Sequence, residues 1–292
     1  MSGSVMIATA GREETLTIHG RQVAFRDYPG GGVPLLLLHG VGSTADSWEP
    51  AAAELAQSGT RVIVLDLPGH GRSSKESGDY SLGALASTLR DLMDQLDVPR
   101  AILVGHSLGG GIALQFSYQF PHRCAGLVLV ASGGLGTETN LALRAATLPG
   151  AGVVMRVAIN DSTVRWAAGV GQQLNRVGAR PQILSEAAVA RMSRLSEPGQ
   201  RNSFLATLRA VVDFSGQRVS ALEKLHVSGD RPVLIVWGER DPIIPMAHGS
   251  QAHDLLANSE LVVFAGAGHE PHRHDPSRFA ALVADWSVRA AA

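Results

Sequence analysis

The sequence predicts an α/β protein in which a mostly parallel sheet of eight strands is flanked by helices. Short apolar runs alternate with helix-length segments, and Gly or Pro bounds the apolar runs. Hydrophobic residues make up 45% of the 292 residues, enough for a sizeable core. Such alternation is typical of parallel sheets covered on both faces. Six runs are predicted as buried strands: Val33–Leu38, Arg61–Leu65, Ala101–Val104, Gly126–Val130, Pro232–Val236 and Glu260–Phe264.

Two further strands are expected ahead of these six. Residues from about Thr15 to Arg26 have the pattern of a hairpin on one edge of the sheet, with His19-Gly20 as its turn. The helix-length segments between the buried strands include Ser81–Leu96 and Leu108–Tyr118. A single α/β domain with an insertion accommodates this length, because such folds often exceed about 250 residues.

The alternation stops between residues 135 and 224. This stretch has helical patterns broken at Pro149-Gly150 and Pro198-Gly199, and it has no convincing strand. It carries eleven basic and six acidic residues, so its net charge is about +5 and that of the remainder about −6. We therefore predict a core of residues 1–134 and 225–292, with residues 135–224 inserted after the sixth strand as a helical cap.

The composition excludes several classes of protein. Lys and Arg number 25 and Asp and Glu 26, so the balance gives no reason to expect a nucleic-acid partner or an acidic membrane surface. The single cysteine, Cys124, excludes an intrachain disulfide and is expected to be a small buried residue. No signal peptide is visible, and no apolar run approaches the roughly 18 residues of a membrane span. We expect a cytoplasmic monomer or homodimer without stable membrane insertion.

The sharpest chemical signal is Gly105-His106-Ser107-Leu108-Gly109. It follows a predicted strand and opens a predicted helix, which is the context of a nucleophile elbow. The turn strains the backbone at the serine, and side chains at the flanking glycines would collide with neighbouring elements. Ser107 is therefore the candidate nucleophile, with an ordinary glycine-rich turn as the alternative.

Two loops that follow strands offer a base and its orienting acid. Asp241 follows one strand and His269 follows the last one, at the sheet edge where sites form. Asp241 would fix the tautomer of His269, which would take the proton from Ser107. Glu239 competes for the role of the acid, and a turn-capping carboxylate is the alternative interpretation of Asp241.

A third strand runs into the glycine-rich loop His39-Gly40-Val41-Gly42. The backbone N–H groups of Val41 and Leu108 are the expected oxyanion donors. The motifs of phosphate-binding loops are absent from this segment. His39 is expected to brace the loop.

A metal site is the rival interpretation of the histidines near the C-terminus. A zinc-binding H-E-x-x-H helix would need a histidine where Arg273 stands, and Pro271 interrupts the helix. We expect no metal and no cofactor. His272 and His274 are instead predicted to be surface or pocket-rim residues.

Several other residues are given structural interpretations. Asp66 and His70 are predicted to belong to a turn whose polar groups satisfy buried backbone. The apolar stretches Leu141–Leu148 and Val153–Ile159 are expected to line a pocket or to pack on the core. Packing roles are expected for all four tryptophans: Trp48, Trp166, Trp237 and Trp286.

Taken together, these motifs resemble the α/β-hydrolase fold family over essentially the whole chain. The resemblance implies an eight-stranded sheet of that family, with the inserted helices where the family carries its cap or lid. It rests on the His39-Gly40 loop, the Asp66–Ser73 turn, the Gly105–Gly109 elbow, the Gly238–Asp241 acid and Gly268-His269.

Within that family the chain is most similar to esterases and to meta-cleavage-product C–C hydrolases, and to uncharacterised actinobacterial hydrolases. Family epoxide hydrolases and haloalkane dehalogenases use an Asp nucleophile, whereas position 107 is Ser. C–C hydrolases usually carry Trp after the catalytic histidine, and this chain has Glu270 there.

The expected function is hydrolysis of carboxylic esters, lactones or thioesters of hydrophobic small molecules through an acyl-enzyme. Two alternatives stay open. One is C–C hydrolysis of meta-cleavage products, whose anionic products suit a cap of net charge about +5. The other is a non-enzymatic scaffold that binds a small hydrophobic ligand, against which the complete Ser–Asp–His set argues.

Overall fold

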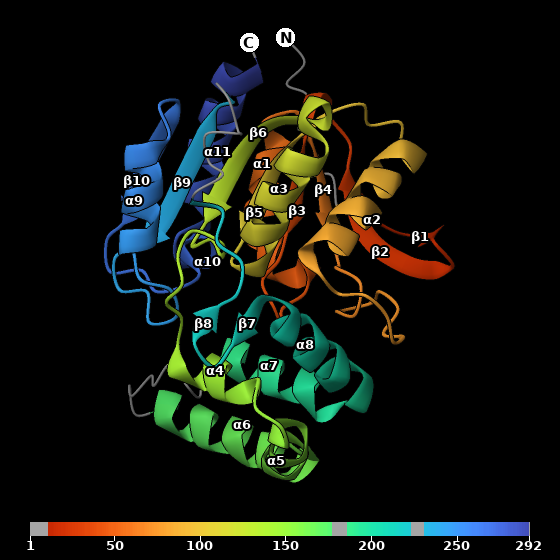
Figure 1. Cartoon of the computed structure of the whole chain (residues 1–292), viewed down its shortest axis with the longest axis vertical. Coiled ribbons are helices and arrows are strands. Elements are labelled where there is room, and N and C mark those ends of the chain that lie inside the picture. Colours follow the sequence, from red (N-terminus) through yellow and green to blue (C-terminus); the bar gives the residue numbers. More distant parts are fainter. Residues whose placement is uncertain (1–10, 177–185, 223–230, 292) are drawn as a thin grey trace.

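The computed structural model describes residues 11–176, 186–222 and 231–291. Its main sheet has eight strands in the order β1-β2-β4-β3-β5-β6-β9-β10 (Figure 1). β1 and β2 form an antiparallel hairpin, β2 pairs antiparallel with β4, and the remaining strands run parallel. The strands are β1 (Arg12–Ile18), β2 (Arg21–Tyr28), β3 (Gly31–Leu38), β4 (Thr60–Leu65), β5 (Ala101–His106), β6 (Cys124–Val130), β9 (Val233–Gly238) and β10 (Ser259–Phe264).

The predicted eight-stranded, mostly parallel α/β fold is confirmed. The hairpin turns at His19 and Gly20, whose φ angles of 51° and 77° suit the tight turns of twisted hairpins. The buried strands were recognisable because parallel strands covered on both faces read as continuous apolar runs. Cys124, predicted to be buried, begins β6 and is 4% exposed.

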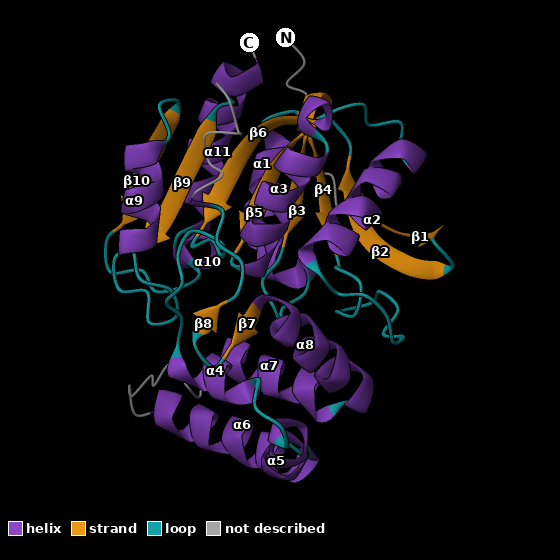
Figure 2. Cartoon of the chain, in the orientation of Figure 1, coloured by secondary structure: helices purple, strands orange, loops and turns teal. Residues whose placement is uncertain are grey.

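Helices cover both faces of the sheet (Figure 2). Successive leucines of β3 alternate between the faces: Leu36 and Leu38 enter the core beneath α2 and α3, whereas Leu35 and Leu37 enter the core beneath α1 and α11. The covering helices are α1 (Glu49–Gln57), α2 (Leu82–Gln95), α3 (Leu108–Gln119), α9 (Ala247–Leu255), α10 (Pro271–His274) and α11 (Pro276–Ala291).

Five helices of the described residues lie between β6 and β9 in the chain and sit beyond one end of the sheet (Figure 1). They have a small core of their own, built by Leu195, Phe204, Leu205, Leu208 and Val212. The Gln200 amide donates to the carbonyl of Gly71 at 3.2 Å, which ties the segment to the rest of the molecule. The helices are α4 (Leu141–Ala146), α5 (Ala151–Ala158), α6 (Asp161–Arg176), α7 (Glu186–Ser196) and α8 (Pro198–Val211).

Two short strands correct the expectation that this part of the chain has none. β7 (Val212–Asp213) and β8 (Gly216–Gln217) form a two-residue antiparallel ladder. Asp213 accepts a hydrogen bond from the Ser215 backbone N–H at 2.8 Å, and Gly216 adopts a φ of 137° that favours glycine. Strands of two residues are too short to carry a detectable alternation.

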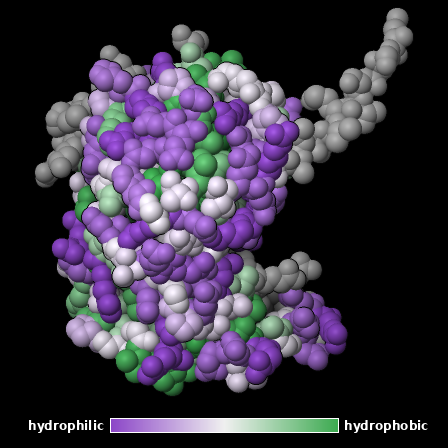
Figure 3. Space-filling view, turned by 90° about the vertical axis from the view of Figure 1, so that its right-hand side faces the viewer, coloured by the Kyte–Doolittle hydropathy of each residue, from purple (hydrophilic) through white to green (hydrophobic). Residues whose placement is uncertain are grey.

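The expected burial of the apolar stretches in this segment is only partly correct. Leu143, Met155 and Ile159 pack on the segment's core. The packing role predicted for Trp166 is wrong, because this residue is 68% exposed. Hydrophobic side chains reach the surface at the lower end of the molecule in Figure 3, where α5 and α6 lie. The exposed large hydrophobic residues of α4, α5 and α6 include Leu141, Val153, Val154, Val157 and Trp166.

Within the described ranges, no helix has both the length and the apolar character needed to cross a membrane.

Candidate active site

Ser107 occupies the turn between β5 and α3. Its φ of 52° and ψ of −113° are unusual for a residue other than glycine, as a nucleophile elbow requires. A Cβ atom at Gly105 would collide with the carbonyl of Gly109, and one at Gly109 with the carbonyl of Leu38. Helix, strand and turn therefore approach closely only because these positions are glycines.

The backbone around the serine is held from several directions. The Ser107 N–H donates to the Val130 carbonyl at 3.0 Å, and the Ser107 carbonyl accepts from the N–H groups of Gly110 at 3.0 Å and Gly133 at 2.9 Å. The hydroxyl makes no hydrogen bond to any group in the described part of the chain and faces a cavity. The turn thus fixes the Cα of Ser107 while leaving its oxygen available.

Asp241 and His269 are brought together, although 28 residues separate them in the chain. The distance from Asp241 Oδ2 to His269 Nδ1 is 2.8 Å. Because a carboxylate only accepts, Nδ1 carries the proton and Nε2 is left as the basic nitrogen. Asp241 Oδ1 accepts from the N–H groups of Ile243 and Ile244 at 2.8 and 3.1 Å, so the buried carboxylate is held at both oxygens.

Glu239, the competing acid, has another partner. Its Oε2 accepts a hydrogen bond from the Gly266 N–H at 2.7 Å, which ties the loop after β9 to the loop after β10. No hydrogen bond joins it to His269 among the described residues. The geometry thus favours Asp241 for the orienting role.

The glycine-rich loop after β3 is braced by His39, as expected. His39 Nδ1 donates to the Gly40 carbonyl at 2.8 Å, and Nε2 accepts from the Leu67 N–H at 3.1 Å. This pattern needs a neutral ring, and complete burial lowers the pKa of His39 to about 4. The loop presents Val41 beside Leu108 and Ser107 at the cavity.

The two expected oxyanion donors, the N–H groups of Val41 and Leu108, have no acceptor among the described residues. In the parts of the chain that the structure describes, neither the Val41 N–H nor the Leu108 N–H donates a hydrogen bond to a protein group. Leu108 is the first residue of α3, so its N–H has no acceptor within the helix and points from the positive end of the helix dipole.

Behind His269 lies a group of buried rings that the sequence did not reveal. His106 Nε2 donates to the backbone carbonyl of His269 at 2.9 Å, and the two ring centroids are 4.8 Å apart. The His106 ring also lies 4.8 Å from that of His272, which stacks on Trp48 at 4.1 Å. Burial lowers the pKa of both His106 and His272 well below the usual value.

The prediction that His272 is a surface or rim residue is therefore wrong, since it is fully buried. Pro271 begins the one-turn helix α10, which turns the His272 ring inward onto Trp48 and Phe279. His274, two residues on, is exposed as expected. The G-H-S-x-G motif did contain a signal for His106, because the residue before an elbow serine ends a buried strand.

The Asp66 turn has the structural role predicted for it. Asp66 Oδ1 accepts from the Ala45 N–H at 2.7 Å and Oδ2 from the Arg72 N–H at 3.0 Å. His70 packs edge-on against His39, with ring centroids 5.2 Å apart, and burial lowers its pKa to about 3. Neither side chain lines the cavity at Ser107.

Cationic side chains gather beside Glu270, the residue after His269. Arg191 on α7 and Arg273 on α10 both pair with the Glu270 carboxylate, at 3.1 and 3.3 Å. Arg194, one helical turn along α7, has no carboxylate partner within the described residues, and burial lowers its pKa. One carboxylate therefore serves two of three guanidinium groups.

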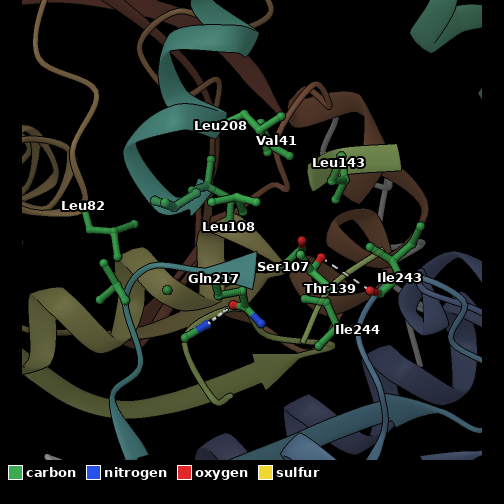
Figure 4. Close-up of a pocket in the computed structure, with 16 residues that line it drawn as sticks. Val41, Leu82, Ser107, Leu108, Thr139, Leu143, Leu208, Gln217, Ile243 and Ile244 are labelled. Atoms are coloured by element: carbon green, nitrogen blue, oxygen red, sulfur yellow. Dashed lines mark hydrogen bonds between the residues drawn. The ribbon is translucent and has the colours of Figure 1, made fainter. Parts of the chain in front are cut away.

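Ser107 opens into a cavity of about 50 Å³ with a mainly aliphatic wall (Figure 4). Besides Ser107, its polar side chains are Thr139 and Gln217, and both are already engaged. Thr139 Oγ1 donates to the Ile243 carbonyl at 3.5 Å, and Gln217 Oε1 accepts from the Gly134 N–H at 2.7 Å. The aliphatic wall is formed by Val41, Leu82, Leu108, Leu143, Leu208, Val211, Val212, Val219, Ile243 and Ile244.

No group of three or more His, Cys, Asp and Glu side chains is arranged to hold a metal ion in the described ranges.

The model of the alpha/beta hydrolase fold matches residues 33–276, which include the elbow and both candidate triad partners. The chain belongs to the α/β-hydrolase fold family. An uncharacterised protein of Mycobacterium tuberculosis is 40% identical over 271 residues, which cover 91% of this chain and 78% of that protein.

Two further proteins resemble the chain over nearly its full length. A 2-hydroxy-6-oxononadienedioate/2-hydroxy-6-oxononatrienedioate hydrolase of Escherichia coli is 28% identical and aligns with 94% of this chain and 92% of its own. The crystal structure of an esterase from Rhodococcus superposes with a TM-score of 0.70 at 26% identity, covering 94% of this chain and 98% of that one. Family membership supports a hydrolase of the α/β-hydrolase type.

Proposed function

We propose that the protein is a serine hydrolase that cleaves carboxylic esters of small molecules with an apolar acyl group. The observation that carries this proposal is the placement of Ser107 on a strained strand-to-helix turn, with its hydroxyl facing an apolar cavity. The resemblance to an esterase supports the same function.

In the proposed reaction the Ser107 oxygen attacks the acyl carbon while His269 Nε2 accepts the hydroxyl proton. Asp241 stabilises the imidazolium that forms and keeps its Nδ1 proton directed at the carboxylate. The N–H groups of Val41 and Leu108 stabilise the oxyanion, and His269 then protonates the departing alkoxide. Water activated by His269 attacks the acyl-enzyme and releases the acid.

The cavity wall favours an acyl group without charge. Its polar side chains have their hydrogen bonds satisfied by backbone groups, and no arginine or lysine of the described ranges lines it. A carboxylate placed there would lose its hydration without gaining a partner, which is strongly unfavourable. Lactones and thioesters share the same acyl chemistry and are further candidate substrates.

The test is turnover of 4-nitrophenyl esters together with labelling by a fluorophosphonate. We expect Ser107→Ala to lose both steady-state turnover and labelling, and Ser87→Ala, on the outer face of α2, to retain them. Labelling that maps to another serine would contradict the proposal. Tight binding of an ester without turnover by the native protein would instead indicate the non-enzymatic scaffold.

A second candidate is C–C hydrolysis of a meta-cleavage product, and Arg194 is the observation that favours it. This guanidinium is partly buried, does not line the aliphatic cavity and has no carboxylate partner among the described residues. An anionic dienoate leaving group would supply one. The resemblance to the Escherichia coli hydrolase supports this candidate as well.

The two candidates separate in one assay. Loss of the dienoate absorbance of a 2-hydroxy-6-oxo-dienoate measures C–C cleavage, and the 4-nitrophenyl ester measures ester cleavage. If C–C cleavage is the function, Arg194→Gln should lower its rate at least tenfold, whereas Arg165→Gln on exposed α6 should not. If the protein cleaves the ester efficiently and does not cleave the dienoate, this second candidate is excluded.

A further inference from the structure

A second cavity, of about 100 Å³, adjoins the one that contains Ser107. The residues that line both cavities are Leu82, Gly111, Gly134 and Val219. In Figure 4 Leu82 lies at the end of the first cavity that is remote from Ser107. The shared residues therefore form a neck between a proximal cavity at the serine and a distal cavity beyond it. The distal cavity is further lined by Leu114, Gln115, Tyr118, Ser220 and Ala221.

The two cavities follow one face of α3. Leu108 and Gly111 line the proximal cavity, and Gly111, Leu114, Gln115 and Tyr118 line the distal one. Steps of three and four residues place these positions in a row along the helix. Because a helix rises about 1.5 Å per residue, the row extends about 6 Å from Ser107 to Gly111, about 12 Å to Gln115 and about 16 Å to Tyr118.

Gly111 stands at the neck, and packing of the protein does not require a glycine there. A Cβ at this position would meet Leu82 at 3.6 Å and the Gly133 carbonyl at 3.7 Å, which are ordinary contacts. The neighbouring Gly109 and Gly110 differ, since a Cβ there would collide with Leu38 and Ser132. Glycine inside a helix is less favourable than alanine. What the glycine at 111 provides is open space between the two cavities.

We propose that the two cavities form one acyl channel along α3, and that the acyl group of the substrate is a straight chain of about eight to ten carbons. An extended alkyl chain advances about 1.3 Å per carbon with bonds of about 1.5 Å, so about five carbons reach Gly111 and longer chains enter the distal cavity. The inference rests on the proposed ester hydrolysis for its substrate and extends the acyl site of that reaction into the distal cavity.

The test compares Gly111→Ala with Gly83→Ala. Both replace a helical glycine, but Gly83 lies outside both cavities and a Cβ there meets only the Gln119 amide at 3.5 Å. Burial of one methylene favours binding by about fourfold. We therefore expect the ratio of kcat/KM for 4-nitrophenyl decanoate over butyrate to fall at least tenfold in Gly111→Ala and to stay at its native value in Gly83→Ala.

A second variant and a binding measurement make the outcome decisive. Gln115→Trp fills the distal cavity from a half-buried position and should lower the same ratio. In thermal unfolding, decanoate should raise the Tm of the native protein and of Gly83→Ala more than butyrate does, and this difference should vanish in Gly111→Ala. An unchanged ratio and an unchanged Tm difference in Gly111→Ala would overturn the channel. Preferential stabilisation by decanoate without turnover of any ester would overturn the proposed hydrolysis alone.

Discussion

Lowering the pH from 7 to 5 should destabilise this protein through four buried histidines. His39 begins the glycine-rich loop after β3 and packs against His70, and His106 and His272 lie behind His269. Burial lowers the pKa of all four: to about 4 for His39, to about 3 for His70 and well below the usual value for the other two. Each ring is therefore neutral in the folded protein throughout this pH range.

In the unfolded chain the same rings titrate near pH 6.5. Below that pH the unfolded state binds more protons than the folded state, so the free energy of unfolding falls as the pH falls. From pH 7 to pH 5 one such histidine lowers it by about 2 kcal/mol, and His39 and His70 together by about 4 kcal/mol. That is a large fraction of a typical 5–15 kcal/mol, and His106 and His272 add to it in the same direction.

The measurement is urea unfolding at pH 7, 6 and 5 and constant ionic strength. The carboxylates with lowered pKa, such as Asp46 and Asp91, contribute mainly below about pH 5, so the histidines dominate this window. His70→Gln should lower by about one the number of protons taken up on unfolding. Between pH 7 and pH 5 the free energy of unfolding of this variant should therefore fall by about 2 kcal/mol less than that of the native protein. His122→Gln, on an exposed turn, should leave it unchanged. Equal stability of the native protein at pH 7 and 5 would refute the reasoning.

Two further predictions concern the site. Asp241→Asn should reduce kcat by roughly three to four orders of magnitude, because it favours the wrong His269 tautomer. Glu239→Gln should keep kcat within a few-fold of the native value. If Glu239→Gln instead lost activity and Asp241→Asn kept it, Glu239 would be the orienting acid. Leu143→Ala should change the relative kcat/KM values for short acyl esters, because Leu143 lines the cavity. Val154→Ala should leave these values unchanged, since Val154 is 66% exposed. Equal changes in both variants would contradict the assignment of the cavity.

The core and the Ser107, Asp241 and His269 candidates were accessible from sequence for a physical reason. Parallel strands buried on both faces leave apolar runs such as Leu35–Leu38, and the turns that end them collect at one edge of the sheet. A polar residue just after such a run therefore has a predictable location, even when the partner is far away in the chain. The contact between Asp241 and His269 follows from that rule and from the order of the motifs.

The failures share a different cause, which is burial decided by distant elements. His272 follows a proline and precedes Arg273, a pattern that fits an exposed turn. The positions of Trp48, His106 and Phe279 make it a buried ring. Conversely, Val154 and Trp166 belong to apolar helix faces that nothing in the described structure covers. Periodicity reveals that a helix has an apolar face but does not reveal whether another element packs on it.

The buried histidines connect the stability of the fold to the proposed chemistry. During acylation His269 becomes an imidazolium, and a second cation beside it would raise the energy of that state. His106 contacts this ring from behind, and it holds the His269 carbonyl through Nε2 while remaining neutral. A buried lysine or arginine at position 106 would supply a donor together with an unwanted charge, and leucine would supply neither. Histidine supplies the donor without the charge because it is buried, and the same burial makes the fold sensitive to acid.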